Sequence, residues 1–371
     1  MSRPITYCDY NAGAPVRPEA AEAVARALAL GGNPSSVHAA GRRAKALVEE
    51  ARERVAASVG ALPENVVFTS GATEALHLAM TSAGAKALVI SETEHDAVFE
   101  QTVRRARDYQ ALPVDSDGVL KSRRAAYVLE NAEAPALLIV QLANNETGVV
   151  QPMRSIAPLA RQHGAMLLVD AAQALGRISV DIADIDATYL VLSSHKIGGP
   201  PGVGALILAP GAPFNIDRFG GGQERGRRPG TENVAAIAGF GVAAEMAAQK
   251  QPREAKRLAA LRDHFEAQLP IDAIVFGKDA ERLPNTSNFA VRGIAAETAV
   301  IAMDLEGVAI SSGSACSSGK VRASRVLSAM GVDGSISKCA LRVSFGWAST
   351  EADVSACIAA LNRVACLAGA A

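Results

Sequence analysis

Short apolar runs of strand length alternate with helical patterns along the first two thirds of the chain, and this alternation restricts the fold more than any other feature. The predicted strands are 66–69, 87–90, 136–142, 165–169, 189–192 and 202–208, and the clearest predicted helices are 42–58 and 155–163. Successions of strand, helix and strand need crossover connections, which build a parallel sheet with helices on its faces. We therefore expect an α/β fold with a mostly parallel sheet.

The length of the chain and its C-terminal part indicate a second, smaller domain. The 371 residues exceed the ~100–200 that typically form one domain. Mixed patterns come last, with predicted strands at 273–276, 287–291 and 340–345 and a final helix that begins at a capping box near 349–353. Two helices, 232–246 and 253–268, are expected to meet near Gln251-Pro252. We place the domain boundary there, with residues 15–250 in a large domain and residues 1–14 plus 251–371 in a smaller α+β domain.

The composition argues against several kinds of partner. Lys+Arg of 37 against Asp+Glu of 38 gives a formal net charge of -1, which offers no broad basic surface for nucleic acid. No stretch approaches the ~20 apolar residues that span a membrane, and no apolar signal segment opens the chain. The five cysteines form no Cys-x-x-Cys pair and no zinc-ligand spacing with histidine. An odd number of cysteines favours a reducing compartment, so we expect a cytoplasmic protein without a metal site.

Two side chains with complementary chemistry stand at the ends of neighbouring predicted strands. Asp170 follows the run 165–169, and Lys196 follows the run 189–192 at the end of a Ser-Ser-His-Lys sequence. Ligands of open parallel sheets gather at the carboxyl ends of strands, so both side chains can face one small molecule. A partly buried lysine can condense with an aldehyde, and a carboxylate can keep a pyridine nitrogen protonated, as pyridoxal 5'-phosphate requires. The plainer interpretations are a surface lysine and a helix N-cap.

A phosphate cradle is predicted where the strand 66–69 leads into a helix. The turn Ser-Gly-Ala-Thr-Glu at 70–74 has small residues that expose backbone N–H groups at Ala72 and Thr73. These groups and the positive end of the helix dipole can bind a phosphate, and the Thr73 hydroxyl adds a donor. An ordinary turn between a strand and a helix is the alternative.

Cys316 differs from the other cysteines because its neighbours are too small and polar to pack in a core. The segment 311–319 reads Ser-Ser-Gly-Ser-Ala-Cys-Ser-Ser-Gly, which is the composition of a mobile loop. A thiol on such a loop can reach a buried cofactor and then swing outward, as a sulfur carrier must. The other cysteines are expected to be small buried hydrophobic residues, namely Cys8, Cys339, Cys357 and Cys366.

Taken in order, these motifs resemble those of the cysteine desulfurases, which are fold-type I, class V aminotransferase-like enzymes that use pyridoxal 5'-phosphate. The matching stretches are 10–15, 32–38, 70–74, 94–95, 144–148, 169–173, 193–196, 228–231, 312–316 and 341–344. The resemblance covers almost the whole chain. It implies the fold-type I architecture, with a mostly parallel sheet in the large domain and a smaller domain that carries the cysteine loop.

The resemblance also implies roles for the residues around the cofactor. Lys196 would carry the cofactor, Asp170 would pair with its ring nitrogen, and Gln173 would contact its ring hydroxyl. His95 would stack on the ring and shuttle protons. The implied phosphate ligands are Thr73, Ser193 and His195, together with Thr231, which would reach the phosphate of the partner subunit in a homodimer.

For the substrate, the resemblance implies a carboxylate clamp at Arg342 with Asn145 beside it. A planar guanidinium suits a carboxylate better than an ammonium group does. The implied activity is the desulfuration of L-cysteine. Lys196 or His95 would remove the α proton, and the thiolate of Cys316 would take the sulfur as a persulfide and leave L-alanine.

Several aspects of the function stay open at the level of sequence. The sulfur would pass to an acceptor protein, for iron–sulfur cluster assembly or another sulfur-transfer pathway. Selenocysteine lyase is an alternative activity, and so is an aminotransferase or lyase on the same fold, which would not need Cys316. A sulfur-relay subunit without turnover is a further alternative.

The chain departs from the family pattern at two places. After Cys316 the family commonly has a Pro-Ser-His step, where this chain has Ala323-Ser324-Arg325. The final helix is expected to run nearly to Ala371, without the tail by which longer members dock an iron–sulfur scaffold protein. The identity of the sulfur acceptor therefore stays open.

Overall fold

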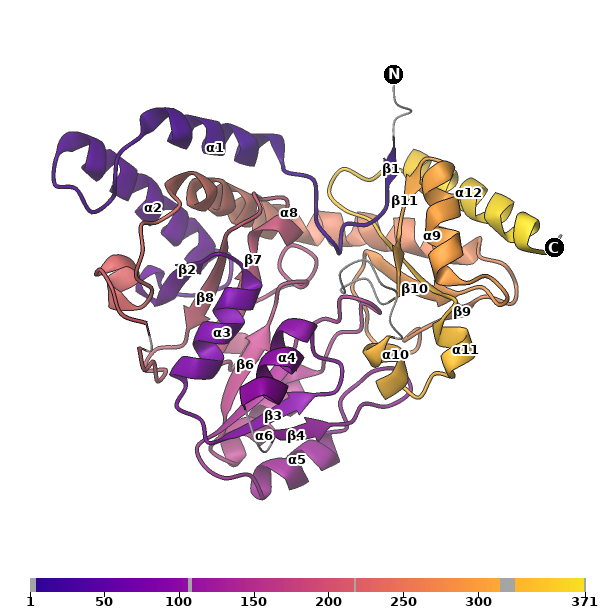
Figure 1. Cartoon of the computed structure of the whole chain (residues 1–371), viewed down its shortest axis with the longest axis horizontal. Coiled ribbons are helices and arrows are strands. Elements are labelled where there is room, and N and C mark those ends of the chain that lie inside the picture. The colour runs from indigo at the N-terminus through magenta and orange to yellow at the C-terminus, as the bar shows by residue number, and fades with distance from the viewer. Residues whose placement is uncertain (1–4, 106–108, 217, 314–323, 370–371) are drawn as a thin grey trace.

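A seven-stranded sheet forms the larger part of the protein, whose computed structural model describes residues 5–105, 109–216, 218–313 and 324–369 (Figure 1). The strand order is β2-β8-β7-β6-β5-β3-β4. The strands are β2 (Val66–Thr69), β3 (Ala87–Ser91), β4 (Tyr109–Leu112), β5 (Ala136–Gln141), β6 (Met166–Asp170), β7 (Tyr189–Ser193) and β8 (Gly204–Leu208). All of them except β4 lie close to strands that the sequence predicts.

The pairing in this sheet is mostly parallel. The strands β7, β6, β5, β3 and β4 pair in parallel, whereas β8 is antiparallel to both of its neighbours, β7 and β2. The expected α/β fold with a mostly parallel sheet is therefore confirmed. Parallel neighbours end at the same edge of the sheet, and the register sets Asp170 opposite Val191. The residues that follow β6 and β7 are thus brought together.

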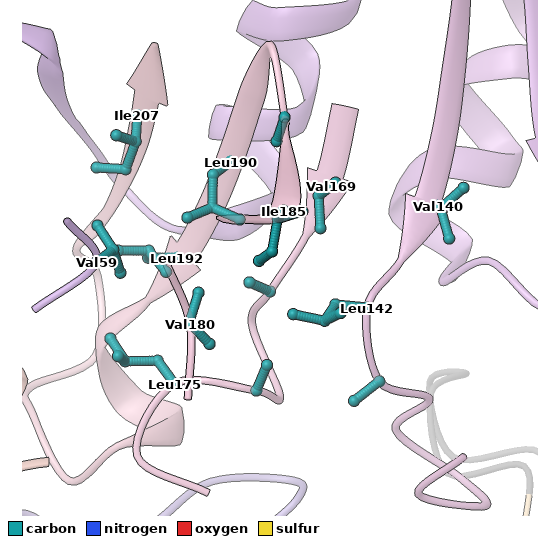
Figure 2. Packing of buried hydrophobic residues seen from close by; sticks show 14 of the residues in the cluster. Val59, Val140, Leu142, Val169, Leu175, Val180, Ile185, Leu190, Leu192 and Ile207 are labelled. Atoms are coloured by element: carbon teal, nitrogen blue, oxygen red, sulfur yellow. The ribbon is translucent and has the colours of Figure 1, made fainter. Parts of the chain in front are cut away.

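Helices bury both faces of the large sheet, which explains why its strands read as continuous apolar runs. One face packs under α2 (Ala39–Ala57), α5 (Ser122–Glu130), α6 (Met153–Gln162) and α8 (Val234–Ala267), and the other under α3 (Ala72–Ser82) and α4 (Asp96–Arg105). Figure 2 shows the first face, with Val140, Val169, Leu190 and Ile207 from successive strands. Two further helices contribute to the core of the first face, α1 (Pro18–Leu30) through Ala20 and α7 (Ile182–Ile185) through Ile182 and Ile185.

A four-stranded antiparallel sheet forms the smaller part, in the order β12-β13-β10-β9. The strands are β9 (Ile274–Val275), β10 (Thr286–Ala290), β12 (Ser311–Ser312) and β13 (Ala340–Ser344), and a separate parallel pair joins β1 (Thr6–Tyr7) to β11 (Val308–Ala309). The helices of this part are α9 (Ala296–Leu305), α10 (Arg325–Ala329), α11 (Gly334–Ser337) and α12 (Glu351–Gly369). Its core contains Phe265, Phe289 and Phe345, and the ring of Phe265 contacts each of the other two edge to face.

The capping box expected at 349–353 is present at the start of α12. The backbone N–H of Thr350 donates to Oδ2 of Asp353 at 2.7 Å, and the N–H of Asp353 donates to Oγ1 of Thr350 at 3.4 Å. One face of this helix packs in the core of the smaller part. Val354, Leu361 and Val364 are buried there, and Ile358 packs partly buried against the same core.

The helix α8 is continuous over 34 residues, so the expectation of two helices that meet near Gln251-Pro252 is wrong. Pro252 removes one hydrogen bond from the helix interior, but packing along both halves holds the helix together. Residues 236–247 pack in the core of the large sheet, and Leu258, Leu261 and Phe265 pack in the core of the small sheet. Figure 1 shows α8 crossing from one part to the other. The change of core falls between Ala247 and Leu258, and the domain boundary near Gln251-Pro252 stays a prediction.

The aromatic contacts at Phe265 generate a stability prediction. Its side chain is fully buried, and its ring centroid lies 5.4 Å from that of Phe289 and 6.1 Å from that of Phe345. Phe265→Ala should lower the free energy of unfolding by about 3–5 kcal/mol because it leaves a cavity. Urea denaturation followed by circular dichroism measures this, with the fully exposed Ile271→Ala as the control. Equal midpoints for the two variants would contradict the prediction.

Candidate active site

A cavity of about 470 Å³ lies at the carboxyl ends of β6 and β7. Asp170 ends β6, and Lys196 ends the 3-10 turn Ser194–Lys196 that follows β7. Both side chains line the same cavity because their strands are parallel neighbours. The predicted site residues that line it are Ala72, Thr73, His95, Asn145, Asp170, Gln173, Ser193, His195, Lys196 and Arg342.

Asp170 is a buried carboxyl group that forms no ion pair within the described part of the chain. It is 3% exposed, and its Oδ1 accepts the backbone N–H of Ala172 at 2.9 Å. Burial raises the pKa of Asp170, and the hydrogen bond from Ala172 and the nearby Lys196 oppose that rise. A cationic group placed in the cavity would stabilise its ionised form.

Lys196 is held at the cavity by the N-terminal segment of the chain. Its Nζ donates to the carbonyl oxygen of Asn11 at 2.5 Å and to that of Ala12 at 3.0 Å. Carbonyl groups position an amino group without neutralising its charge. The backbone at residues 11–12 therefore sets the place of the lysine head group.

His95 lies in the turn before α4 and is held as a neutral imidazole. The backbone N–H of Ala97 donates to Nδ1 at 3.0 Å, so the proton of the neutral ring resides on Nε2. Burial is the main cause that lowers the pKa of His95. The preceding Glu94 is 1% exposed, and burial raises its pKa well above the ordinary value. His95 is thus arranged to offer a proton at Nε2 rather than to accept one.

The predicted phosphate cradle is the N-terminus of α3. Among the described residues, none accepts a hydrogen bond from the backbone N–H of Ala72, Thr73 or Glu74. These donors and the positive end of the helix dipole therefore border the cavity, which the same residues line. Gly204 of β8 lies directly behind the cradle, where a Cβ would come within 2.8 Å of the Gly71 backbone. Glycine is required there for this close approach.

Glu74 would repel a phosphate if its charge were not balanced by two arginines. Arg218 Nη1 donates to its Oε1 at 2.6 Å, and Arg228 donates to both carboxylate oxygens at 3.2 Å. Although burial acts in the opposite direction, Arg228 and the Ser70 N–H hold the pKa of Glu74 down at about 2. The carboxylate is thus ionised and paired beside the cradle.

His195 and Gln173 complete the polar lining. Nδ1 of His195 lies 3.1 Å from Oγ of Ser193, and burial, with Lys196 nearby, lowers the pKa of His195 to about 4. His195 is therefore neutral near pH 7. Nε2 of Gln173 donates to the carbonyl oxygen of Asn11 at 2.9 Å.

Arg342 is a buried guanidinium in the middle of β13. Its Nη1 donates to the carbonyl oxygen of Asn145 at 2.9 Å, and its Nη2 donates to Oδ1 of Asp9 at 2.6 Å. Each of these nitrogens carries two N–H groups, so donors remain for a further acceptor. The buried Nε has no partner among the described residues. Arg342 can therefore donate hydrogen bonds to a further carboxylate in addition to that of Asp9.

Two predicted site residues are not placed in the cavity. Thr231 is exposed and does not line it. Its expected target belongs to a partner subunit, so its role stays a prediction. Cys316 belongs to residues 314–323, which lie outside the described part of the chain.

Arg325, where the sequence departs from the family pattern, fixes the turn that carries His95. Its Nη2 donates to the carbonyl oxygen of Glu94 at 2.6 Å, and its Nη1 donates to Oδ1 of Asp96 at 2.9 Å. Its guanidinium also lies 4.1 Å from the ring centroid of Phe99. These contacts join the chain after the cysteine segment to both neighbours of His95.

Asn11 is the most connected site residue that the sequence reasoning did not single out. Its carbonyl oxygen accepts from Lys196 and Gln173, and its Nδ2 donates to Oγ1 of Thr286 at 2.9 Å. Its backbone N–H donates to Oγ of Ser344 at 3.0 Å. Its place in the matching stretch 10–15 was the only signal for it.

The cysteines outside the 314–323 segment are mostly structural. Cys8 and Cys357 are fully buried in the core of the smaller part, as expected, and Cys339 packs partly buried against the other core. The expectation that Cys366 is buried is wrong, because it lies exposed on the outward side of α12. Within the described ranges, no group of three His, Cys, Asp or Glu side chains could hold a metal ion. No helix among those residues is both long and apolar enough to cross a membrane.

Comparison with known proteins defines the family of this fold and site. Residues 6–357 match the model of the aminotransferase class-V family, and the chain belongs to that family. It is 36% identical to the cysteine desulfurase IscS of Dictyoglomus turgidum over 371 residues, which cover 96% of this chain and 94% of that protein.

Comparison with solved structures agrees with this family assignment. The NifS-like protein of Rickettsia africae superposes with a TM-score of 0.91 at 29% identity and covers 97% of this chain and 99% of its own. The structure described as SspA in complex with cysteine superposes with a TM-score of 0.77 at 28% identity and covers 91% of this chain and 98% of its own. The expected fold-type I architecture is thus confirmed.

The cavity fits pyridoxal 5'-phosphate, the cofactor that the family implies. Asp170 is a buried carboxyl group that needs a cation, which a protonated ring nitrogen supplies. The start of α3 offers backbone donors to a phosphate, and Lys196 offers an amine to an aldehyde. Three separate parts of the cofactor thus meet matching chemistry in one cavity.

Glu146 links pH to stability beside this cavity. It is 8% exposed, and its Oε2 accepts the hydroxyl of Ser324 at 2.5 Å. Burial raises the pKa of Glu146 from 4.5 to about 7. The folded protein therefore keeps a proton that the unfolded chain loses above pH 4.5, and stability falls as pH rises from about 4.5 to about 7.

Glu146→Gln removes this ionisation and should stabilise the protein more at pH 8 than at pH 5. The rise in the Glu146 pKa corresponds to at most about 3 kcal/mol in the free energy of unfolding. Thermal unfolding at the two pH values measures the difference, with the exposed Glu130→Gln as the control. A gain in stability that is the same at both pH values would refute the raised pKa of Glu146.

Proposed function

We infer that this chain is a cysteine desulfurase that uses pyridoxal 5'-phosphate to take sulfur from L-cysteine and leave L-alanine. One observation carries this conclusion. A lysine, a buried aspartate and a buried arginine converge on one cavity, in a chain similar over nearly its full length to a curated cysteine desulfurase. The solved structure of SspA in complex with cysteine, which is similar to this chain, supports the choice of substrate.

The residues of the cavity divide the work of binding. Lys196 would hold the cofactor aldehyde, Asp170 would keep its ring nitrogen protonated, and the start of α3 would bind its phosphate with Thr73, Ser193 and His195. When bound, the cofactor supplies an electron sink for the charge that develops at the substrate α carbon. Arg342, beside Asn145, would bind the substrate carboxylate with its remaining N–H donors.

Lys196 is better placed than His95 to remove the α proton. Nδ1 of His95 accepts the Ala97 N–H, so the neutral ring has its proton on Nε2 and acts as a donor. The amine of Lys196, when it is not bound to the cofactor, would be able to accept a proton. His95 would then provide a hydrogen bond to the bound molecules.

The sulfur transfer itself is assigned to Cys316, on the evidence of its sequence context. Its thiolate would attack the sulfur of the bound cysteine, so that a sulfur–sulfur bond forms while the carbon–sulfur bond of the substrate breaks. The electron pair left on carbon would take up a proton, which gives the methyl group of alanine. Cys316 would keep the sulfur as a persulfide.

The proposal extends to partners and location. The persulfide would pass to an acceptor protein, for iron–sulfur cluster assembly or another sulfur-transfer pathway, in the cytoplasm. A homodimer would bring Thr231 to the phosphate site of the partner subunit. The exposure of Thr231, which leaves its side chain accessible to a partner subunit, supports this.

Alanine formation from L-cysteine with a reductant tests the function directly. Cys316→Ala should keep the visible absorption of lysine-bound cofactor and lose alanine formation more than about 100-fold, because the sulfur acceptor is gone. Lys196→Ala should lose the absorption as well. Cys366→Ala, which removes an exposed cysteine elsewhere, is the matched control and should leave the rate unchanged.

The same assay separates the rival activities. An aminotransferase would need an added amino acceptor and would tolerate Cys316→Ala, and a relay subunit would bind no cofactor. Faster turnover of selenocysteine than of cysteine would indicate a selenocysteine lyase. A Cys316→Ala protein that released alanine at the normal rate would overturn the desulfurase assignment.

A further inference from the structure

Arg177 is a buried cation that pairs with no carboxylate among the residues of known placement. It is 6% exposed, and burial lowers its pKa to about 9. The preceding Gly176 has φ +78°, and a Cβ there would lie 2.9 Å from Cβ of Ala247 on α8. Glycine thus lets the chain turn against α8 and directs the arginine inward. An unpaired buried charge is costly, so its retention calls for a reason.

The oxygen atoms that surround the Arg177 guanidinium belong mainly to residues proposed to bind the cofactor. Nη1 of Arg177 donates to the carbonyl oxygen of Gln173 at 2.7 Å and also to Oε1 of the Gln173 side chain. Nη2 donates to the carbonyl oxygens of Tyr10 at 3.3 Å and Lys196 at 3.4 Å. Arg177 therefore contacts the two residues that would bind the ring hydroxyl and the aldehyde of the cofactor.

These contacts decide which end of the Gln173 amide is available to a ligand. A guanidinium can only donate, so the atom that faces it must be the amide oxygen. The amide nitrogen has two N–H groups, of which one donates to the carbonyl oxygen of Asn11. Gln173 can therefore offer the cavity an N–H donor and not a carbonyl oxygen. A donor suits an oxygen that carries negative charge.

Arg177 acts from behind the cavity rather than from within it. It does not line the cavity of about 470 Å³, but it lines a separate space of about 30 Å³ on which Lys196 also borders. A space of that size holds about one water molecule and no substrate. Arg177 is thus placed to influence the site only through Gln173, through Lys196 and by its charge.

We propose that Arg177 is a positioning residue of the cofactor site: it fixes Gln173 as a hydrogen-bond donor toward the ring oxygen of pyridoxal 5'-phosphate and, with its fixed positive charge, favours the ionised form of that oxygen. The proposal rests on the proposed function, because it needs the cofactor in this cavity. It assigns Arg177 no contact with the substrate.

The test is a pH titration of the visible absorption band of lysine-bound pyridoxal 5'-phosphate in the full-length protein. Arg177→Met removes both the charge and the orientation of Gln173, and each loss favours retention of a proton near the ring oxygen. The midpoint should rise by about one pH unit, and the cofactor should bind about ten-fold more weakly in a fluorescence titration of the apoprotein. Arg177→Lys keeps the charge but not the forked contacts, and its midpoint should fall between those of the wild-type protein and Arg177→Met.

A double-mutant comparison isolates the contact with Gln173. Gln173→Ala should raise the midpoint in the wild-type background and add little in the Arg177→Met background, because the two residues act as a unit. Arg257→Met is the matched control. Arg257 also donates to backbone carbonyls, those of Gly346, Trp347 and Ser349, but it contacts no cofactor residue. The Arg257→Met substitution should lower thermal stability and leave the midpoint of the absorption titration unchanged.

The outcomes separate this inference from the proposed function. A normal midpoint in Arg177→Met, with stability lowered as in Arg257→Met, would show a purely structural role and overturn the proposal. If Arg177→Met fails to fold, Arg177→Lys takes its place. A wild-type absorption midpoint in Arg177→Lys, together with an effect of Gln173→Ala that is the same in the Arg177→Lys and wild-type backgrounds, would then overturn the proposal. Absence of the absorption band in the wild-type protein would instead overturn the cofactor assignment itself.

Discussion

The carbonyl group of Asn11 is the contact on which the arrangement of the site depends. It accepts from both Lys196 and Gln173, while the backbone N–H and side chain of the same residue bind Ser344 and Thr286 in the small sheet. All the polar groups involved are in or beside a buried region, where each needs a partner. The N-terminal segment thus joins the small antiparallel sheet to the two strand ends of the large one.

The charges around the cavity follow a second constraint, which is that buried groups are only partly compensated. Asp170 has no cationic partner and Arg177 has no carboxylate within the described ranges, whereas Arg342 is paired with Asp9 and Glu74 with two arginines. Of the unpaired groups, Asp170 lines the cavity, where a cationic group of a bound cofactor would compensate its charge, and Arg177 lies behind the cavity. A site of this kind is prepared for a ligand that brings a cationic ring nitrogen and a phosphate.

The parts that could be predicted from sequence are those governed by local pattern. Apolar runs predicted six strands of the large sheet, and the order of strands and helices predicted its mostly parallel pairing. The chemistry of Lys196 and Asp170 was also accessible, because each lies at or shortly after the end of a predicted strand. The continuous α8 was not predictable, since Pro252 gives a local signal to stop that packing against two cores overrides. The exposure of Cys366 was missed for a related reason, because only the packed helix shows which side faces outward.

The sequence by itself determined the fold class, the family and the identity of the chemical groups, because these depend on residue type, spacing and order along the chain. Only the tertiary structure decided how those groups are oriented and paired. The proton on Nε2 of His95 follows from backbone geometry at the start of α4. The donor end of Gln173 is set by Arg177, four residues later, and by Asn11 of the N-terminal segment. Arg325 contacts both neighbours of His95, which lie far from it in sequence. Hydrogen bonds have direction, and that direction is fixed only when the folded chain brings donor and acceptor together.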